Sequence, residues 1–172
     1  MRTILTSTLT GIVGCGALGC GSVPDAASDA ELIAPGEPSV VIGYYAGDDY
    51  QPVSVTAEAR VLWGTQGGTW TMPSVRIRGI ASPTLVSGTL VRAPDTDSSE
   101  VLGTSERELQ FVRIADGSLE CRAVAVPVQH APPRQFESIT DLYGQVALLT
   151  ITASDAQGRS ATSSSFATLV ED

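Results

Sequence analysis

The chain contains no lysine and no asparagine, and all ten of its basic residues are arginines. The absence of lysine excludes a P-loop lysine, a Schiff-base lysine and a Ser–Lys catalytic dyad. Nineteen acidic residues give a formal net charge of −9 at pH 7. This acidity argues against nucleic-acid binding, which needs a positive footprint, and against electrostatic docking on anionic lipid.

Histidine and cysteine are also scarce, with one His and three Cys. Zinc sites take three or four Cys, His or acidic ligands and usually contain close pairs such as C-x-x-C, which this sequence lacks. There is no G-x-S-x-G nucleophile elbow, and no other segment indicates a nucleophile for His130. Because His130 lies in a proline-bounded stretch, we expect it to be an exposed loop histidine. In the absence of these motifs, we expect no catalytic residue and no cofactor.

The first nineteen residues form the pattern of a bacterial lipoprotein signal peptide. A positive start at Arg2 leads into an apolar run and then a Gly-Cys junction at Cys20. The run carries threonines and glycines, so it is a poor membrane-spanning segment. Lipidation is expected at Cys20, where polar sequence starts at once. Cys15, which follows the better-matching Ile12-Val13-Gly14, is the alternative.

This signal predicts an exported protein that is lipid-anchored to the cell envelope, in the outer membrane if the cell has one. Residues 20–38, rich in Ser, Pro, Asp, Ala and Glu, are expected to form a flexible, disordered tether. Residues 39–172 suffice for one domain of ordinary size. Cys121 in that domain stands among alternating charged neighbours, which favours a buried, unreactive thiol over a reactive one.

Alternation of apolar and polar residues runs through the rest of the chain and is clearest over residues 53–63. This pattern predicts a strand with one buried and one wet face. A Gly-rich turn over 64–68 leads to a return strand over 69–78, in which Pro73 predicts a bulge or an edge position. Further strands are expected at 40–43, 84–92, 108–114, 119–128, 145–153 and 160–170, with hairpins at 116–117 and 155–158.

Seven or eight short strands separated by turns, with no sustained helical stripe, predict an all-β fold built as an antiparallel β-sandwich. Residues 141–159 resemble the last two strands of bacterial immunoglobulin-like modules, including the PKD type. In those modules a Gly-bounded turn precedes an alternating strand, a D-x-x-G hairpin and the final strand. The resemblance implies an immunoglobulin-like sandwich and no activity, with Tyr143 as a corner tyrosine bonded to backbone.

The segment from Trp63 to Trp70 resembles a Gln-Gly-Gly turn of bacterial lipoproteins of unknown function. One interpretation is a binding platform made by Trp63, Gln66, Gly67, Gly68 and Trp70, where the rings stack on sugars or anchor a protein partner. The competing and favoured interpretation is that both tryptophans fill the core, because Trp63 shares the alternating apolar face of its strand.

An acidic stretch follows the strand expected at 84–92. Asp95, Asp97, Ser99 and Glu106 fall at positions one, three, five and twelve of an EF-hand-like loop, which suits the oxygen-rich coordination of Ca²⁺. Position six is Glu100 instead of the glycine that the sharp turn needs, and no helices flank the segment. A solvated acidic loop is therefore favoured, and a Ca²⁺ site at these four residues is the alternative.

These features favour a lipid-anchored cell-envelope protein that acts as a non-catalytic binding or scaffolding module. Its expected partners are the membrane, through the lipid, and an envelope protein or a polysaccharide. The alternative is a carboxylate-dependent, glycosidase-like envelope hydrolase or its carbohydrate-binding accessory module. A cleft lined by two close carboxylates would favour the hydrolase, and a compact sandwich without a deep pocket would favour binding.

Overall fold

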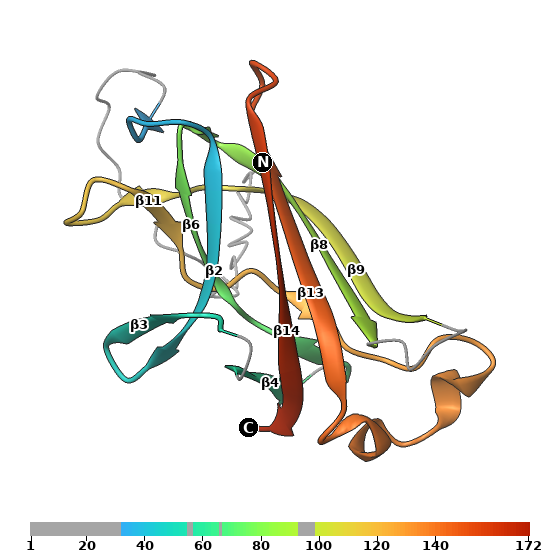
Figure 1. Ribbon diagram of the computed structural model, residues 1–172. Helices are drawn as coiled ribbons and strands as arrows, with labels where there is room; N and C mark the ends of the chain where they lie inside the picture. The colour runs from blue at the N-terminus through green and yellow to red at the C-terminus, as the bar shows by residue number, and fades with distance from the viewer. Residues whose placement is uncertain (1–31, 55–56, 66, 93–98) are drawn as a thin grey trace, which may run out of the picture. The chain divides into compact units, whose positions relative to one another are not determined.

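The computed structural model describes residues 32–54, 57–65, 67–92 and 99–172. These residues form fourteen β-strands and two short 3-10 helices, with no α-helix among them (Figure 1). The all-β class expected from the alternating sequence is confirmed. No helix in this part of the chain is long and apolar enough to cross a membrane. Cys15 and Cys20 lie outside the described residues.

The largest sheet has seven strands, in the order β12-β5-β4-β14-β13-β8-β9. In chain order they are β4 (Ala57–Trp63), β5 (Thr69–Thr71), β8 (Thr84–Arg92), β9 (Glu100–Leu109), β12 (Val126–Pro127), β13 (Val146–Ser154) and β14 (Ser160–Glu171). β14 runs parallel to β4, while the other neighbours are antiparallel. The expectation of a strictly antiparallel sandwich is therefore wrong at this pair. A hairpin would force these two strands to be antiparallel, but most of the domain lies between them in the chain, so a parallel pairing is possible.

The second sheet has five strands, in the order β10-β11-β6-β2-β3. They are β2 (Ser39–Ala46), β3 (Asp49–Pro52), β6 (Ser74–Arg78), β10 (Val112–Arg113) and β11 (Leu119–Cys121). A separate two-stranded ribbon joins β1 (Leu32–Ile33) to β7 (Ala81–Ser82). Among the described residues, the first strand thus lies inside the segment that was expected to be a tether.

Two of the expected strands are divided between sheets. The short strands β1, β3 and β7 were not expected, and the strand expected at 108–114 is replaced by the end of β9 and by β10, so the number of strands rises to fourteen. The return strand expected over 69–78 breaks before Pro73 into β5 and β6. Proline has no N–H for a ladder bond, so the chain leaves one sheet there and enters the other. The strand expected over 119–128 divides in the same way into β11 and β12. Sheet switching of this kind ties the two sheets around a common core.

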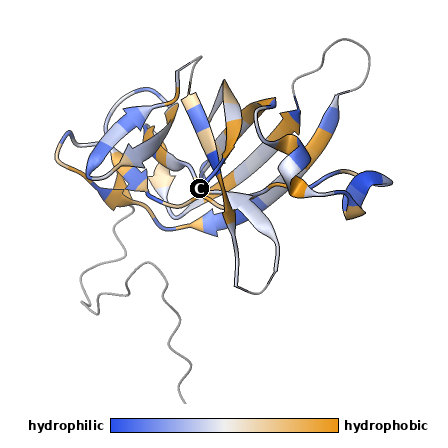
Figure 2. Cartoon of the chain, turned by 90° about the horizontal axis from the view of Figure 1, so that it is seen from below, coloured by the Kyte–Doolittle hydropathy of each residue, from blue (hydrophilic) through white to orange (hydrophobic). Residues whose placement is uncertain are grey.

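The inner faces of the sheets meet in one hydrophobic core. Hydrophobic and hydrophilic positions alternate along the strands that border it (Figure 2). Cys121 of β11 belongs to this core, which confirms the expected burial of its thiol. The most deeply buried large apolar side chains are Ile77, Ile80, Leu90, Leu102, Leu119, Leu142, Leu149, Ile151 and Leu169.

The two ends of the seven-stranded sheet come together, so that the sheet nearly closes on itself. Across this seam the Gln129 N–H, just after β12, donates to the Leu102 carbonyl of β9 at 3.0 Å. A Cβ atom at Gly103 would collide with the Pro127 carbonyl, so glycine permits the close approach. The seam places the residues that follow β12, including His130, beside the start of β9.

The C-terminal hairpin of β13 and β14 forms as the sequence predicts and extends beyond the neighbouring strands (Figure 1). Its turn is held by the buried Asp155 carboxylate, which accepts from the Gln157 and Arg159 N–H groups at 3.0 Å each. The same carboxylate accepts from the Ala81 N–H and from the Arg159 guanidinium. Burial raises the pKa of Asp155, but these donors outweigh it and leave that pKa below its ordinary value.

Candidate functional site

The end of β4 carries an exposed tryptophan. Trp63 is 61% exposed, so the expectation that it fills the core is wrong. The buried face of its strand ends at Val61, and the chain turns into the Gly64–Gly68 loop immediately beyond Trp63. The Trp63 indole N–H donates to the Tyr143 hydroxyl at 3.3 Å. The corner tyrosine expected from the sequence therefore bonds to a side chain and orients the exposed ring.

Trp70, on the facing strand β5, is half-buried and plays a different part from Trp63. Its ring lies over the backbone of the loop, since a Cβ atom at either Gly64 or Gly68 would collide with it. These two glycines are thus explained by the close packing of the indole. Gly67 has open space around its Cα and a φ of 79°, which suits a turn glycine. Gln66 lies outside the described residues.

Beside Trp63 the surface has a hollow of about 240 Å³, here called the Trp63 hollow. It is formed by the end of β4, the start of β5 and the segment that follows β12. Its lining residues are Trp63, Gly68, Thr69, Gln129, His130, Gln135, Glu137, Ser138 and Ile139. The turn that the sequence suggested for binding therefore lies beside the only histidine of the chain, because β12 pairs with β5.

His130 lies at the base of this hollow and is only 3% exposed. The expectation of an exposed loop histidine is wrong, because the seam between β9 and β12 covers the His130 ring, although its neighbour Gln129 stays exposed. The Nδ1 atom lies 3.4 Å from the Glu100 carboxylate, and the Nε2 atom lies 3.2 Å from the Ser138 carbonyl oxygen. Both ring nitrogens therefore face oxygen acceptors.

Glu100, at the start of β9, holds the far side of the His130 ring. Its carboxylate accepts from the Ala131 N–H at 3.0 Å and pairs with the Arg92 guanidinium at 3.0 Å. Burial raises the pKa of Glu100, but the Ala131 N–H, Arg92 and His130 together bring that pKa below its ordinary value. Glu100 is therefore ionised near neutral pH, and its carboxylate can accept a hydrogen bond from an Nδ1–H of His130.

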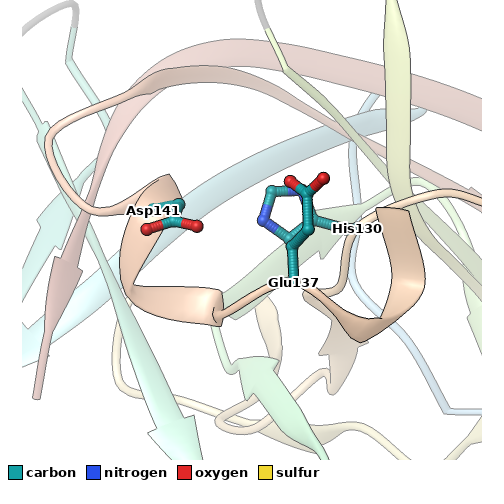
Figure 3. Close-up of side chains that lie close together, drawn as sticks. All are labelled: His130, Glu137 and Asp141. Atoms are coloured by element: carbon teal, nitrogen blue, oxygen red, sulfur yellow. The ribbon is translucent and has the colours of Figure 1, made fainter. Parts of the chain in front are cut away.

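The segment between β12 and β13 brings two more carboxylates to the ring. It contains the 3-10 helices η1 (Arg134–Phe136) and η2 (Ile139–Leu142). Ile139 and Leu142 anchor η2 in the core, while Asp141 on the same helix is exposed. The Asp141 and Glu137 carboxylates both lie next to the His130 imidazole (Figure 3). One ligand atom from each of the three residues lies within 4.8 Å of the others.

We call His130, Glu137 and Asp141 the His130 cluster. Zinc was set aside from the sequence because no close pair of ligands is visible, but the fold gathers three ligand-bearing side chains here. Their spacing, H-x6-E-x3-D, is the only sequence signal for the cluster, and on its own it specifies no known loop. Neither spacing nor composition shows that His130 is buried or that η2 turns Asp141 toward it.

The acidic stretch proposed for Ca²⁺ is not assembled as an EF-hand-like loop. Asp95 and Asp97 lie outside the described residues. Ser99 and Glu106 are both exposed, and the strand β9 runs between them. At about 3.3 Å per residue in an extended strand, they stand roughly 20 Å apart and cannot share one cation.

A second charged cluster, built around Glu120 of β11, lies in the five-stranded sheet. The Glu120 side chain is fully buried and accepts from the Tyr45 hydroxyl at 2.7 Å, the Arg76 guanidinium at 2.7 Å and the Arg122 guanidinium at 3.1 Å. The guanidinium of Arg76 also stacks on the ring of Tyr50, and that of Arg122 on the ring of Tyr45. A hollow of about 310 Å³ lies beside it, between β2, β3 and the start of β4. No local pattern in the sequence predicts this arrangement, because its members lie far apart in the chain, from Tyr45 to Arg122.

The Trp63 hollow and the His130 cluster are thus the candidate functional site. They combine an exposed aromatic ring, held by a hydrogen bond, with a buried imidazole and two exposed carboxylates. Comparison with known proteins adds no assignment. No protein-family model matches this chain, and neither a curated protein nor a solved structure matches it.

Proposed function

We propose that this chain is a non-catalytic binding module of the cell envelope that is held to a membrane by a lipid on Cys20 and binds polysaccharide at the Trp63 hollow. The exposure of Trp63, together with its orientation by Tyr143, is the observation that carries the proposal. A large apolar ring that is held in place yet left in water has a cost unless something covers it. The anchoring rests on the signal pattern at the start of the sequence.

The chemistry around Trp63 suits a sugar. The apolar face of a sugar ring can cover an indole, while its hydroxyl groups bond to nearby amides and carboxylates. Gln129, Gln135 and Glu137 line the same hollow and offer both donors and acceptors. Protein partners, the other class expected from the sequence, are more often recognised by several clustered aromatic or arginine anchors than by one ring among amides.

The immunoglobulin-like, PKD-type assignment is part of the proposal. It is supported by the β13–β14 hairpin with its D-x-x-G turn and by two sheets that share one core. Loops at one end of such a sandwich commonly carry the binding residues, and the loop after β4 is of this kind. The parallel β4–β14 pair is where this chain departs from a purely antiparallel version.

Binding can be tested by sedimentation with insoluble envelope polysaccharide that has been extracted with detergent and digested with protease. We expect the purified protein to sediment with this material and Trp63→Ala to bind at least ten-fold more weakly, which corresponds to about 1.4 kcal/mol. Phe166→Ala is the matched control, because Phe166 is an exposed aromatic side chain of β14. We expect it to bind as the original protein does.

Equal sedimentation of the Trp63→Ala variant would overturn the proposed site. Binding only to envelope material that has not been treated with protease would replace the polysaccharide by a protein partner. Thermal melting of each variant checks that binding is lost without unfolding. Since Trp63 is mostly exposed, its truncation should leave the melting temperature within a few degrees of the original.

A hydrolase remains the second candidate because Glu137 and Asp141 lie close together, at a spacing near that of paired glycosidase carboxylates. The observation against it is the exposure of both side chains, whereas the general acid of a glycosidase lies in apolar surroundings. Release of reducing sugar from the same polysaccharide, lost in Glu137→Gln, would establish the hydrolase in place of the binding module.

A further inference from the structure

We infer that the His130 cluster is a binding site for a divalent transition-metal cation, with Zn²⁺ as the best match to its ligands. His130 Nε2 and the Glu137 and Asp141 carboxylates would bind the ion, and Glu100 would act as a positioning residue behind the imidazole. The site stands independently of the proposed polysaccharide, since its test needs no sugar.

The first argument is the hydrogen bonding of the His130 ring. Glu100 faces Nδ1 at 3.4 Å, so a neutral imidazole carries its proton there and leaves a lone pair on Nε2. That lone pair points toward the Ser138 carbonyl oxygen, which is 3.2 Å away and is also an acceptor. Without metal, an Nε2 proton donated to this oxygen satisfies the contact, and a metal cation would take the place of that proton.

The second argument is the charge beside that nitrogen. Glu137 and Asp141 bring two carboxylates to the open side of the ring (Figure 3). Arg92 is already paired with Glu100, and Arg134 reaches Glu137 only at 3.9 Å. None of the ion pairs among the described residues involves Asp141. A dication at the cluster would compensate the Asp141 carboxylate and would add to the single, long ion pair of Glu137.

The third argument is the arrangement of ligands in two layers. Metal-binding histidines usually donate their second ring N–H to a carboxylate, which fixes the tautomer and the ring orientation. Glu100 occupies that place and is itself held by Arg92 and by the Ala131 N–H. The buried side of the site is therefore rigid, and the exposed side chains of Glu137 and Asp141 can move onto an ion.

The ligand atoms determine which cation fits. One imidazole nitrogen with carboxylate oxygens suits Zn²⁺, whereas Ca²⁺ takes six to eight oxygen ligands. Zn²⁺ bonds of about 2.0–2.2 Å hold two ligand atoms no more than roughly 4.4 Å apart. The three atoms already lie within 4.8 Å of one another, so small rotations of the two exposed carboxylates close the site.

The test is calorimetric titration of the purified full-length protein in detergent, without a polyhistidine tag, after dialysis against a chelator. We expect one Zn²⁺ ion per chain and no comparable binding of Ca²⁺. The double variant Glu137→Gln/Asp141→Asn should bind Zn²⁺ at least a hundred-fold more weakly. Glu100→Gln should weaken binding by about ten-fold, as loss of an outer carboxylate does at other sites.

Asp49→Asn/Glu108→Gln is the charge-matched control, because both residues are exposed, on β3 and near the far end of β9 from Glu100. It should bind Zn²⁺ within two-fold of the original protein. X-ray absorption at the zinc edge should show one imidazole among nitrogen and oxygen ligands. The inference is overturned if no saturable Zn²⁺ binding occurs below 1 mM, if the double variant binds as the original does, or if Ca²⁺ binds equally well.

Discussion

Glu120 and His130 are two buried titratable side chains that lie in opposite electrostatic surroundings. Glu120 is surrounded by donors, with two guanidinium groups and a hydroxyl directed at its carboxylate. His130 is surrounded by acceptors, with Glu100 and the Ser138 carbonyl at its nitrogens and two exposed carboxylates beside it. The first cluster is complete within the chain. In the second, Glu137 has only the 3.9 Å ion pair with Arg134, and none of the ion pairs among the described residues involves Asp141.

This difference separates a structural charge cluster from a candidate binding site. A buried charge is tolerated when hydrogen bonds and opposite charges compensate it, and it then holds the surrounding elements together. A cluster that lacks its counter-charge and opens to the surface is suited to receive that charge from outside. If this contrast holds, substitutions in the Glu120 cluster should destabilise the protein more than substitutions in the His130 cluster.

The largest effect is expected from Glu120→Gln. The change removes the negative charge that pairs with Arg76 and Arg122 and leaves a buried amide with mismatched partners. Loss of charged hydrogen bonds in such a place costs about 3 kcal/mol in the free energy of unfolding. Urea unfolding measures it, with Glu108→Gln, an exposed change on β9, as a control that should stay within about 0.5 kcal/mol. A loss as small as that of the control would mean that Glu120 does not hold the sheet together.

The same cluster should make stability sensitive to acid. Burial raises the pKa of Glu120, but the hydrogen bonds from Tyr45, Arg76 and Arg122 outweigh it and bring that pKa below the ordinary value of 4.5. A lowered folded-state pKa adds stability above 4.5, and that stability is lost as the pH falls through the folded-state value. Glu100 and Asp155, whose pKa values are also lowered, act in the same direction.

The measurement is the free energy of unfolding between pH 7 and pH 3. We expect a decline in the original protein as the pH falls below about 4.5, and a shallower decline in Glu120→Gln, because one of the three contributing carboxyl groups has been removed. Parallel curves for the two proteins would show that Glu120 is not among the groups responsible.

A smaller effect is expected from Glu100→Gln in metal-free protein. The amide oxygen can still accept from the Ala131 N–H, but the ion pair with Arg92 is lost. Since Arg92 stays partly exposed to water, the cost should be about 1–2 kcal/mol by urea unfolding. A cost equal to that of Glu120→Gln would mean that the charges around His130 stabilise the fold as much as those around Glu120, and the contrast between the two clusters would be wrong.

The smallest effect is expected from Glu137→Gln/Asp141→Asn, again without metal. Both side chains are exposed, and the two negative carboxylates lie close to each other. Neutralising them should therefore change the free energy of unfolding by no more than about 0.5 kcal/mol. With Zn²⁺ present, the original protein should melt at a higher temperature than this variant, because an ion that binds only the folded state stabilises it. An unchanged melting temperature of the original protein at saturating Zn²⁺ would contradict the site.

Strands and turns with local signals could be predicted from the amino-acid sequence. The period-two pattern identified β8 over 84–92 and the hairpin of β13 and β14, and the D-x-x-G turn formed where it was expected. The burial of Cys121 also followed from alternation within its own strand. Side-chain direction along a strand is set residue by residue, so these features need no knowledge of the remaining fold.

Which strands pair, and which side chains the pairing brings together, could not be predicted in this way. The parallel pairing of β4 with β14, the two changes of sheet and the seam between β9 and β12 join segments far apart in the chain. Burial of His130 and exposure of Trp63 follow from that seam and from where the core ends, and local alternation carries neither. Sites made from distant residues depend on long-range packing, which a periodic pattern cannot encode.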